Sequence, residues 1–188
     1  MANRQVTAVL TSLAPYSQSA PVRSVPGDHE DKNAFEERTW RERMHVTAHD
    51  EVFIPPMGIY HAICAAARFR NQGIKGQGKK TYTKRFESGV LIYELVRLGI
   101  KSADVKGERL FVPSDGKPGG GKRVWRIFPQ IPEWRATVDL ILADDLISEE
   151  VFRAHLEDAG KFIGLGRFRP EHRGFYGRFA VESLTVAV

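Results

Sequence analysis

The stretch GLGRFRPEHRGFYGRF, residues 164–179, lies between a predicted helix at 148–162 and a predicted last strand that begins near Gly177. It combines four glycines and four arginines with several aromatic residues. Glycine lets a backbone bend or approach a ligand closely, and arginine and aromatic side chains suit phosphates and unpaired bases. The stretch is not a dinucleotide fingerprint, because Arg169 takes the position of the third glycine and a helix precedes it. Its position indicates more than an ordinary turn.

The composition is that of a folded protein with a basic surface. Of 188 residues, 42% are hydrophobic and 27% are charged, which excludes a disordered chain. The net charge of +5 favours a polyanionic partner. Cys64 is the only cysteine, so an intramolecular disulfide and a multi-cysteine metal site are excluded. Because the six histidines are scattered, we expect no metal site, and we expect no cofactor.

Two further observations bear on location. The first residues lack the basic start and continuous apolar core of a signal peptide. No apolar run approaches the ~20 residues of a membrane span. We therefore expect a cytoplasmic protein without a membrane partner.

The first half of the chain shows strand and helix patterns around a polar segment. β-branched residues at 4–13 predict an opening strand, and apolar residues at helical spacing predict a helix at 57–69. The proline-containing stretch 17–36 predicts a mobile loop. Residues 37–47 alternate between apolar and basic side chains, which predicts a strand with a basic face. The stretch 85–98 is ambiguous between helix and strand.

The second half has clearer patterns. A glycine-rich turn between two short apolar runs predicts a projecting β-hairpin at 106–130, with its tip at 115–122. Strict alternation at 134–143 predicts a core strand. A helix at 148–162 follows, with Ser148 as its N-cap. We expect a single domain over 1–188.

A second glycine-rich stretch, GIKGQGKKT, nearly spells a phosphate-binding loop. Lys80 stands where the motif needs serine or threonine, and a helix precedes the loop where the motif needs a strand. A nucleoside triphosphatase is therefore disfavoured. A histidine beside a basic groove can cleave RNA by acid–base catalysis, and His61 and His45 are the candidates if the protein is an enzyme.

Positive charge gathers in three segments that glycines punctuate and aromatic residues interrupt. Cations neutralise phosphates, and aromatic rings stack on unpaired bases. This pattern favours nucleic-acid binding over an ordinary solvated surface. The predicted nucleic-acid contacts are Arg41, Arg43, Arg68, Arg70, Lys75, Lys79, Lys80, Lys84, Arg85, Lys122, Arg123, Arg167, Arg169, Arg173, Tyr176 and Arg178.

The glycine-rich stretch resembles that of the RAMP superfamily, the RNA-recognition-motif-like proteins of CRISPR effector complexes. Their mark is a loop between the last helix and the last strand, with paired glycines around a basic segment. Gly164, Gly166, Gly174 and Gly177 match it, although Phe175 and Tyr176 put two residues between the final glycines where the pattern has one. The resemblance implies an α+β, ferredoxin-like βαββαβ unit with insertions, and a thumb-like role for the hairpin.

The leading hypothesis is a non-catalytic binder of single-stranded RNA or DNA. The resemblance adds assembly into a filament or ring along the strand, as a homo-oligomer or with other subunits of a nucleoprotein complex. One alternative is a histidine-dependent, metal-independent endoribonuclease that processes guide RNA. Another is a phage or mobile-element protein that imitates a CRISPR subunit through protein–protein contacts.

Overall fold

Four antiparallel strands form the main sheet of the protein. The computed structural model describes residues 3–116 and 121–187. The sheet has the order β4-β8-β1-β9, so the opening strand lies in its centre. Its strands are β1 (Arg4–Ser12), β4 (Val90–Leu91), β8 (Arg135–Leu142) and β9 (Phe179–Ala187). The predicted core strand is confirmed, because its alternate apolar residues from Trp134 to Leu142 are all buried.

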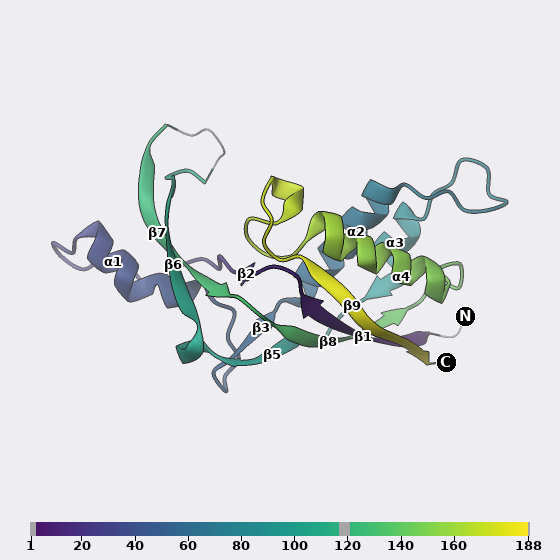
Figure 1. Cartoon of the computed structure of the whole chain (residues 1–188), viewed down its shortest axis with the longest axis horizontal. Helices are drawn as coiled ribbons and strands as arrows, with labels where there is room; N and C mark the ends of the chain where they lie inside the picture. The colour runs from purple at the N-terminus through teal and green to yellow at the C-terminus, as the bar shows by residue number, and fades with distance from the viewer. Residues whose placement is uncertain (1–2, 117–120, 188) are drawn as a thin grey trace.

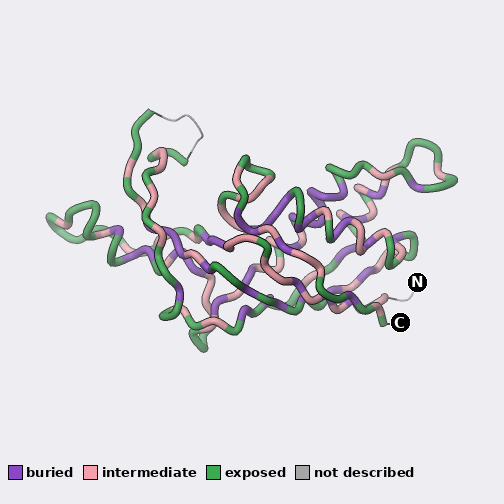
Figure 2. The backbone as a smooth tube through the Cα atoms, viewed as in Figure 1, coloured by how far each residue is buried: buried purple, intermediate pink, exposed green. Residues whose placement is uncertain are grey.

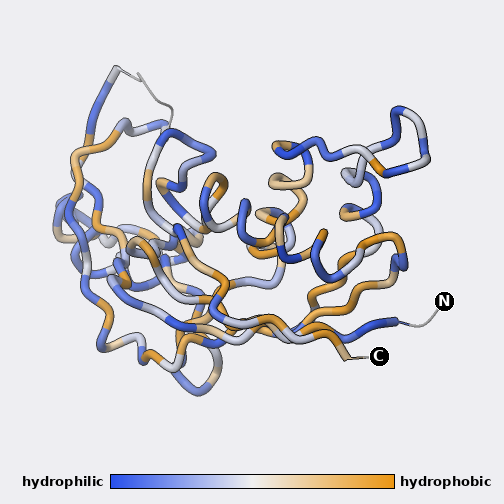
Figure 3. Tube along the Cα trace, turned by 45° about the vertical axis from the view of Figure 1, so that its right-hand side comes forward, coloured by the Kyte–Doolittle hydropathy of each residue, from blue (hydrophilic) through white to orange (hydrophobic). Residues whose placement is uncertain are grey.

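Helices cover one face of this sheet (Figure 1). They are α2 (Pro56–Arg70), α3 (Thr83–Gly89) and α4 (Glu149–Asp158), which a π turn, η3 (Ala159–Ile163), extends. Figure 2 shows that the residues where these helices meet the sheet are buried, and Figure 3 shows that the same segments are hydrophobic. The predicted N-cap is confirmed, because the Ser148 hydroxyl accepts a hydrogen bond from the Val151 amide. The α+β class and the helix predicted at 57–69 are also confirmed.

A second sheet stands at the other end of the molecule. Its order is β2-β7-β6, with β2 (Tyr16–Ser17), β6 (Lys106–Pro113) and β7 (Arg123–Ile131). β6 and β7 pair antiparallel and project from the body as a hairpin (Figure 1). Of the predicted hairpin tip, residues 117–120 lie outside the described residues.

Short elements complete the chain. β3 (Glu51–Ile54) pairs with β5 (Val96–Lys101), and two 3-10 turns are η2 (Ser102–Asp104) and η4 (Pro170–His172). The ambiguous stretch 85–98 holds the end of α3, then β4, then the start of β5. None of the helices in the described part of the chain is long and apolar enough to cross a membrane.

The strand predicted at 37–47 is wrong. This segment ends α1 (Lys32–Thr39) and forms a 3-10 turn, η1 (Trp40–Arg43). Trp40 and Met44 are four residues apart, a spacing that suits one helix face as well as one strand face, and both are buried. The Asp31 carboxylate caps α1 by accepting hydrogen bonds from the amides of Asn33 and Ala34, which favours a helix over a strand at this point of the chain.

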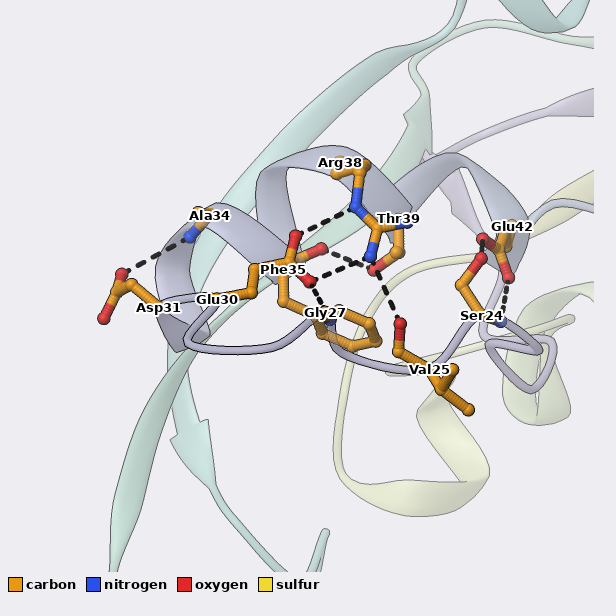
Figure 4. Close-up of polar contacts among 10 residues, drawn as sticks. All are labelled: Ser24, Val25, Gly27, Glu30, Asp31, Ala34, Phe35, Arg38, Thr39 and Glu42. Atoms are coloured by element: carbon orange, nitrogen blue, oxygen red, sulfur yellow. Dashed lines mark hydrogen bonds and ion pairs between the residues drawn. The ribbon is translucent and has the colours of Figure 1, made fainter.

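The predicted loop at 17–36 is irregular only from residue 18 to residue 31, because Ser17 belongs to β2 and the last five residues belong to α1. Figure 4 shows how the irregular part is held against that helix. Arg38 forms an ion pair with Glu30 at 2.9 Å, which lowers the pKa of Glu30 to about 2. Glu42 accepts hydrogen bonds from the amide and the hydroxyl of Ser24. The mobility of this loop stays a prediction.

A buried carboxylate joins α1 to the hairpin. Glu36 is 2% exposed and lies within 3.0 Å of Arg43 and within 2.9 Å of Arg126. It also accepts a hydrogen bond of 2.6 Å from the Ile127 amide. A buried charge is costly unless it is paired in this way. Glu36 therefore fixes the positions of both guanidinium groups.

We expect Glu36→Gln to lower the free energy of unfolding by about 3 kcal/mol, because Arg43 keeps its buried charge without a counter-charge. Glu37→Gln is the matched control. Glu37 is half-exposed and only 3.7 Å from Arg109, so its loss should cost less than about 1 kcal/mol. Urea unfolding measures both values. Equal losses in the two variants would contradict this role for Glu36.

Candidate nucleic-acid interface

The glycine-rich loop, residues 164–178, is closed onto itself and onto the start of the chain. Within the loop, the Leu165 amide donates to the Gly177 carbonyl and the Tyr176 amide donates to the Phe168 carbonyl, both at 3.0 Å. The Gly177 amide donates to the Pro15 carbonyl, and the Arg167 amide donates to the Ser17 carbonyl. These bonds satisfy backbone groups that a looser loop would leave to water.

This packing requires glycine at two positions, because neither of them has room for a side chain. A Cβ atom on Gly174 would lie 1.7 Å from the Phe168 carbonyl oxygen, and one on Gly177 would lie 1.9 Å from the Leu165 carbonyl oxygen. Gly177 also has a φ of +68°, in the left-handed region that favours glycine. The loop conformation therefore depends on glycine at both positions.

Backbone strain marks the same loop. Phe168 and Arg173 adopt φ values of +54° and +64°, which are uncommon for residues with a side chain. Such strain persists only where the surroundings hold it, and it gathers at functional sites. Here it presents the Phe168 ring, which is 38% exposed, and the exposed Arg173 guanidinium.

Arg167 connects the loop to the hairpin through stacked side chains. Its guanidinium carbon lies 3.1 Å from the centre of the Phe128 ring and 3.8 Å from that of Phe168. Its Nη1 atom is buried and has no hydrogen-bond partner in the described structure. Burial, together with the nearby charge of Arg43, lowers the pKa of Arg167 to about 10, so the group is still charged at neutral pH. The charged guanidinium of Arg167 therefore lies against two aromatic rings, and its Nη1 atom can still donate a hydrogen bond.

Tyr176 makes the second connection to the hairpin. Its hydroxyl lies 2.9 and 3.0 Å from the two carboxylate oxygens of Glu108, and it accepts a hydrogen bond from the Gln130 side chain. Tyr176 is buried, and burial is the main cause that raises its pKa. We assign Tyr176 a positioning role rather than the direct contact predicted from the sequence.

A groove of about 1400 Å³ lies between the glycine-rich loop, the hairpin and the segment that follows β2. Glu171 is the only carboxylate among its described lining residues, whereas six arginines line it. These are Arg43, Arg123, Arg126, Arg167, Arg169 and Arg173. Five of them were predicted from the sequence, and their convergence from three distant segments gives the groove a strong positive charge.

The six arginines are not equivalent. Glu36 compensates Arg43 and Arg126 from beneath the groove. Arg169 is bound to Glu171 at 2.8 Å and donates to the Gly166 carbonyl, so it clamps the loop. Among the described residues, Arg167 and Arg173 have no carboxylate partner. Arg123 donates to the Phe111 carbonyl. Arg167 and Arg173 therefore keep their positive charge for a ligand.

A smaller pocket of about 260 Å³ adjoins the groove on the other side of the loop. His45 and His61, the two candidate catalytic residues, both line it, together with Tyr16, Gln18 and Arg169. The Gln18 side chain accepts from the His45 amide and donates to the Phe53 carbonyl, which fixes this wall. Burial lowers the pKa of His45.

Other predicted contacts carry carboxylate partners that the sequence segment did not reveal. The run from 68 to 85 contains no acid, but Glu87 lies just beyond it and folding brings two further acids to it from distant segments. Arg68 and Lys84 pair with Glu87, Arg70 pairs with Asp158, and Arg85 pairs with Asp144. These surface pairs reduce the charge available to a nucleic acid.

The remaining predicted contacts lie apart from the groove lining. Arg41 stacks on Trp40, and Arg178 donates to the Lys161 carbonyl in the middle of the π turn. Lys122 is exposed beside the hairpin tip. Lys75, Lys79 and Lys80 are exposed on the loop after α2. This loop extends away from the glycine-rich loop (Figure 1).

Sequence reasoning missed Phe128 and Glu36. In the sequence, Phe128 is not distinguished from the other apolar residues of its strand, although its ring stacks against the Arg167 guanidinium. Glu36 reads as one of several surface acids, and no local signal marks it as buried.

No family model matches the sequence, and no curated protein does. Among solved structures, the fold is similar to the crystal structure of Cmr6 from Pyrococcus furiosus, with a TM-score of 0.51 and 12% identity over 96% of this chain and 99% of that chain. A chain of the Type III-B Cmr-beta complex bound to cognate target RNA gives a TM-score of 0.46 and 10% identity, over 96% of this chain and 61% of that chain. A chain of a CRISPR RNA-guided surveillance complex gives 0.43 and 8%, over 98% and 68%. The predicted resemblance to the RAMP superfamily is confirmed as a likeness of fold.

We expect Gly174→Ala to destabilise the protein by about 2 kcal/mol, because the added methyl group would collide with the Phe168 carbonyl and the backbone must shift. Gly73→Ala is the matched control, since a Cβ there meets nothing within 4 Å. Thermal unfolding compares the two. A Gly174 variant as stable as the control would show that the loop does not need its close packing.

Proposed function

We propose that the protein binds a single strand of RNA or DNA in the groove between the glycine-rich loop and the hairpin, without cleaving it. The observation that carries the proposal is the convergence of six arginines on a groove whose described lining holds one carboxylate. Phosphate neutralisation by such cations dominates nucleic-acid affinity. The exposed rings of Phe168 and Phe175 offer stacking surfaces for unpaired bases beside it.

We infer that the main sheet and its helices are a ferredoxin-like βαββαβ unit. In chain order the four strands are β1, β4, β8 and β9, with α2 and α3 in the first crossover and α4 in the second. The order β4-β8-β1-β9 puts the first strand between the third and the fourth, as in that unit. The glycine-rich loop follows the second crossover helix and its π turn, which is where the RAMP resemblance puts a strand-binding loop.

Assembly along the strand belongs to the same proposal. A hairpin that projects from the body could reach a neighbouring subunit, either a second copy or another member of a nucleoprotein complex. Gel filtration with and without a long single strand tests this: a particle that grows with strand length supports assembly, and a fixed one-to-one complex contradicts it.

Anisotropy of a labelled single strand, measured against salt concentration, tests the binding proposal. We expect tight binding at low salt and a steep loss as salt rises, because phosphate contacts release counterions. Arg173→Ala should lower the salt slope by about 1 and weaken all sequences alike.

Arg135→Ala is the control, because this exposed arginine pairs with Glu182 on the main sheet, away from the groove. No binding at low salt would refute the proposal. A slope that is unchanged in the Arg173 variant, or lowered equally in both variants, would refute the assignment of the groove.

A second function is favoured by one observation, the presence of His45 and His61 in one pocket beside the groove. One histidine can take the proton of a 2′-hydroxyl while another gives a proton to the leaving oxygen. Arg169 lines the same pocket and could stabilise the charge that develops on the phosphate. This arrangement would make the protein a metal-independent endoribonuclease.

Incubation with structured RNA in EDTA decides between binding and cleavage. If the pocket is catalytic, His45→Ala and His61→Ala each abolish cleavage, while His49→Ala does not, because His49 is exposed and outside the pocket. As base, His45 should give a rate that rises with pH through a pKa below about 6.5, since burial lowers its pKa. Intact RNA after incubation with the wild-type protein would leave binding as the function.

A further inference from the structure

The C-terminal end of α2 carries an exposed aromatic pair, and the loop that follows α2 carries three lysines without an ion-pair partner in the described structure. Phe69, near the end of α2, and Phe162, in the π turn, stack with ring centres 5.0 Å apart. They are 59% and 39% exposed, whereas Ile59, Ile63 and Ile163 of the same elements are buried. Lys161 lies 5.1 Å from the centre of the Phe162 ring. An exposed aromatic pair of this kind calls for a partner that covers it.

The π turn itself supports a functional reading of this pair. Turns of this type are rare and occur most often at functional sites, because the extra residue changes the direction of the side chains that follow. The turn is firmly held: a Cβ on Gly160 would lie 2.1 Å from the Phe179 carbonyl oxygen, and Arg178 caps the Lys161 carbonyl. Phe162 is therefore presented to solvent by a fixed element.

The loop that follows α2, residues 71–81, carries three lysines and is held by its own backbone contacts. Gly73 and Thr81 form an isolated antiparallel β-bridge, and the Ile74 amide donates a hydrogen bond to the Lys80 carbonyl. The Ile74 side chain is buried. The side chains of Lys75, Lys79 and Lys80 are exposed and form no ion pair with any described residue. This contrasts with Arg68, Arg70, Lys84 and Arg85, which all have carboxylate partners.

One face of α2 connects this end to the groove. His61 lines the small pocket that shares Arg167 and Arg169 with the groove, and Ala65 and Phe69 follow it at positions i+4 and i+8 of the helix. Eight residues of helix span about 12 Å. Ala65, between the two ends, is only 7% exposed and belongs to the core, so His61 and Phe69 are the exposed positions of this face.

We propose that the nucleic-acid strand bound in the groove continues along α2 to a second contact site, where its bases stack on Phe69 and Phe162 and its phosphates meet Lys75, Lys79 and Lys80. This inference rests on the proposed function. It predicts that long strands bind with two sites and that short strands use the groove alone. Aromatic side chains and unpaired cations together suit a single strand better than an acidic protein face.

The test compares oligouridylates of about 6 and about 20 nucleotides. Phe69→Ala/Phe162→Ala should weaken binding of the long strand by about tenfold and leave the short strand unchanged. Lys79→Gln/Lys80→Gln should act in the same direction. Its control is Lys32→Gln/Lys106→Gln, which removes the same charge from exposed lysines of α1 and β6.

The outcomes separate the two proposals. Wild-type protein that binds neither length would refute the proposed function itself. Tight wild-type binding that the two variants leave unchanged at both lengths, or reduce only as far as the control does, would refute the second site alone. Thermal unfolding checks that the double Phe variant stays folded.

Discussion

The conformation of the site depends on backbone packed against backbone in the glycine-rich loop. Gly174 and Gly177 bring the loop within contact of its own carbonyl groups, where a methyl group has no room. This closure forces Phe168 and Arg173 into left-handed conformations and sets the direction of Arg167. Arg167 then stacks on Phe128, so the same constraint joins the loop to the hairpin and shapes the groove between them.

Ion pairing decides which basic residues keep their charge for a ligand. Glu87, just beyond the basic run at 68–85, and two acids from distant segments compensate much of that run, and Glu36 compensates two arginines of the groove from beneath. Among other positions, positive charge without a carboxylate partner in the described part of the chain remains at Arg167 and Arg173 beside the groove and at the three lysines after α2. α2 lies between these places, which gives an extended surface rather than a single point of contact (Figure 1).

Much of the fold was predictable because its signals are local. Strict alternation predicted β8, helical spacing predicted α2, and Ser148 predicted the start of α4. The segment around Arg41 and Arg43 was not, because a four-residue apolar spacing fits both a helix and a strand. For the site, five of the six groove arginines were predicted, since clustered charge is visible in sequence. Their compensation was not, because it depends on acids far along the chain, such as Asp144 and Asp158.

Binding in the groove requires the nucleic-acid strand to lie against the glycine-rich loop. Photo-crosslinking of a bound single strand that carries 4-thiouridine, followed by mass spectrometry of the crosslinked peptides, tests this most directly. We predict crosslinks in the peptide with Phe168 and Phe175 and in the hairpin strand with Phe128. Crosslinks confined to the exposed face of the main sheet, with none in the loop or hairpin, would contradict it.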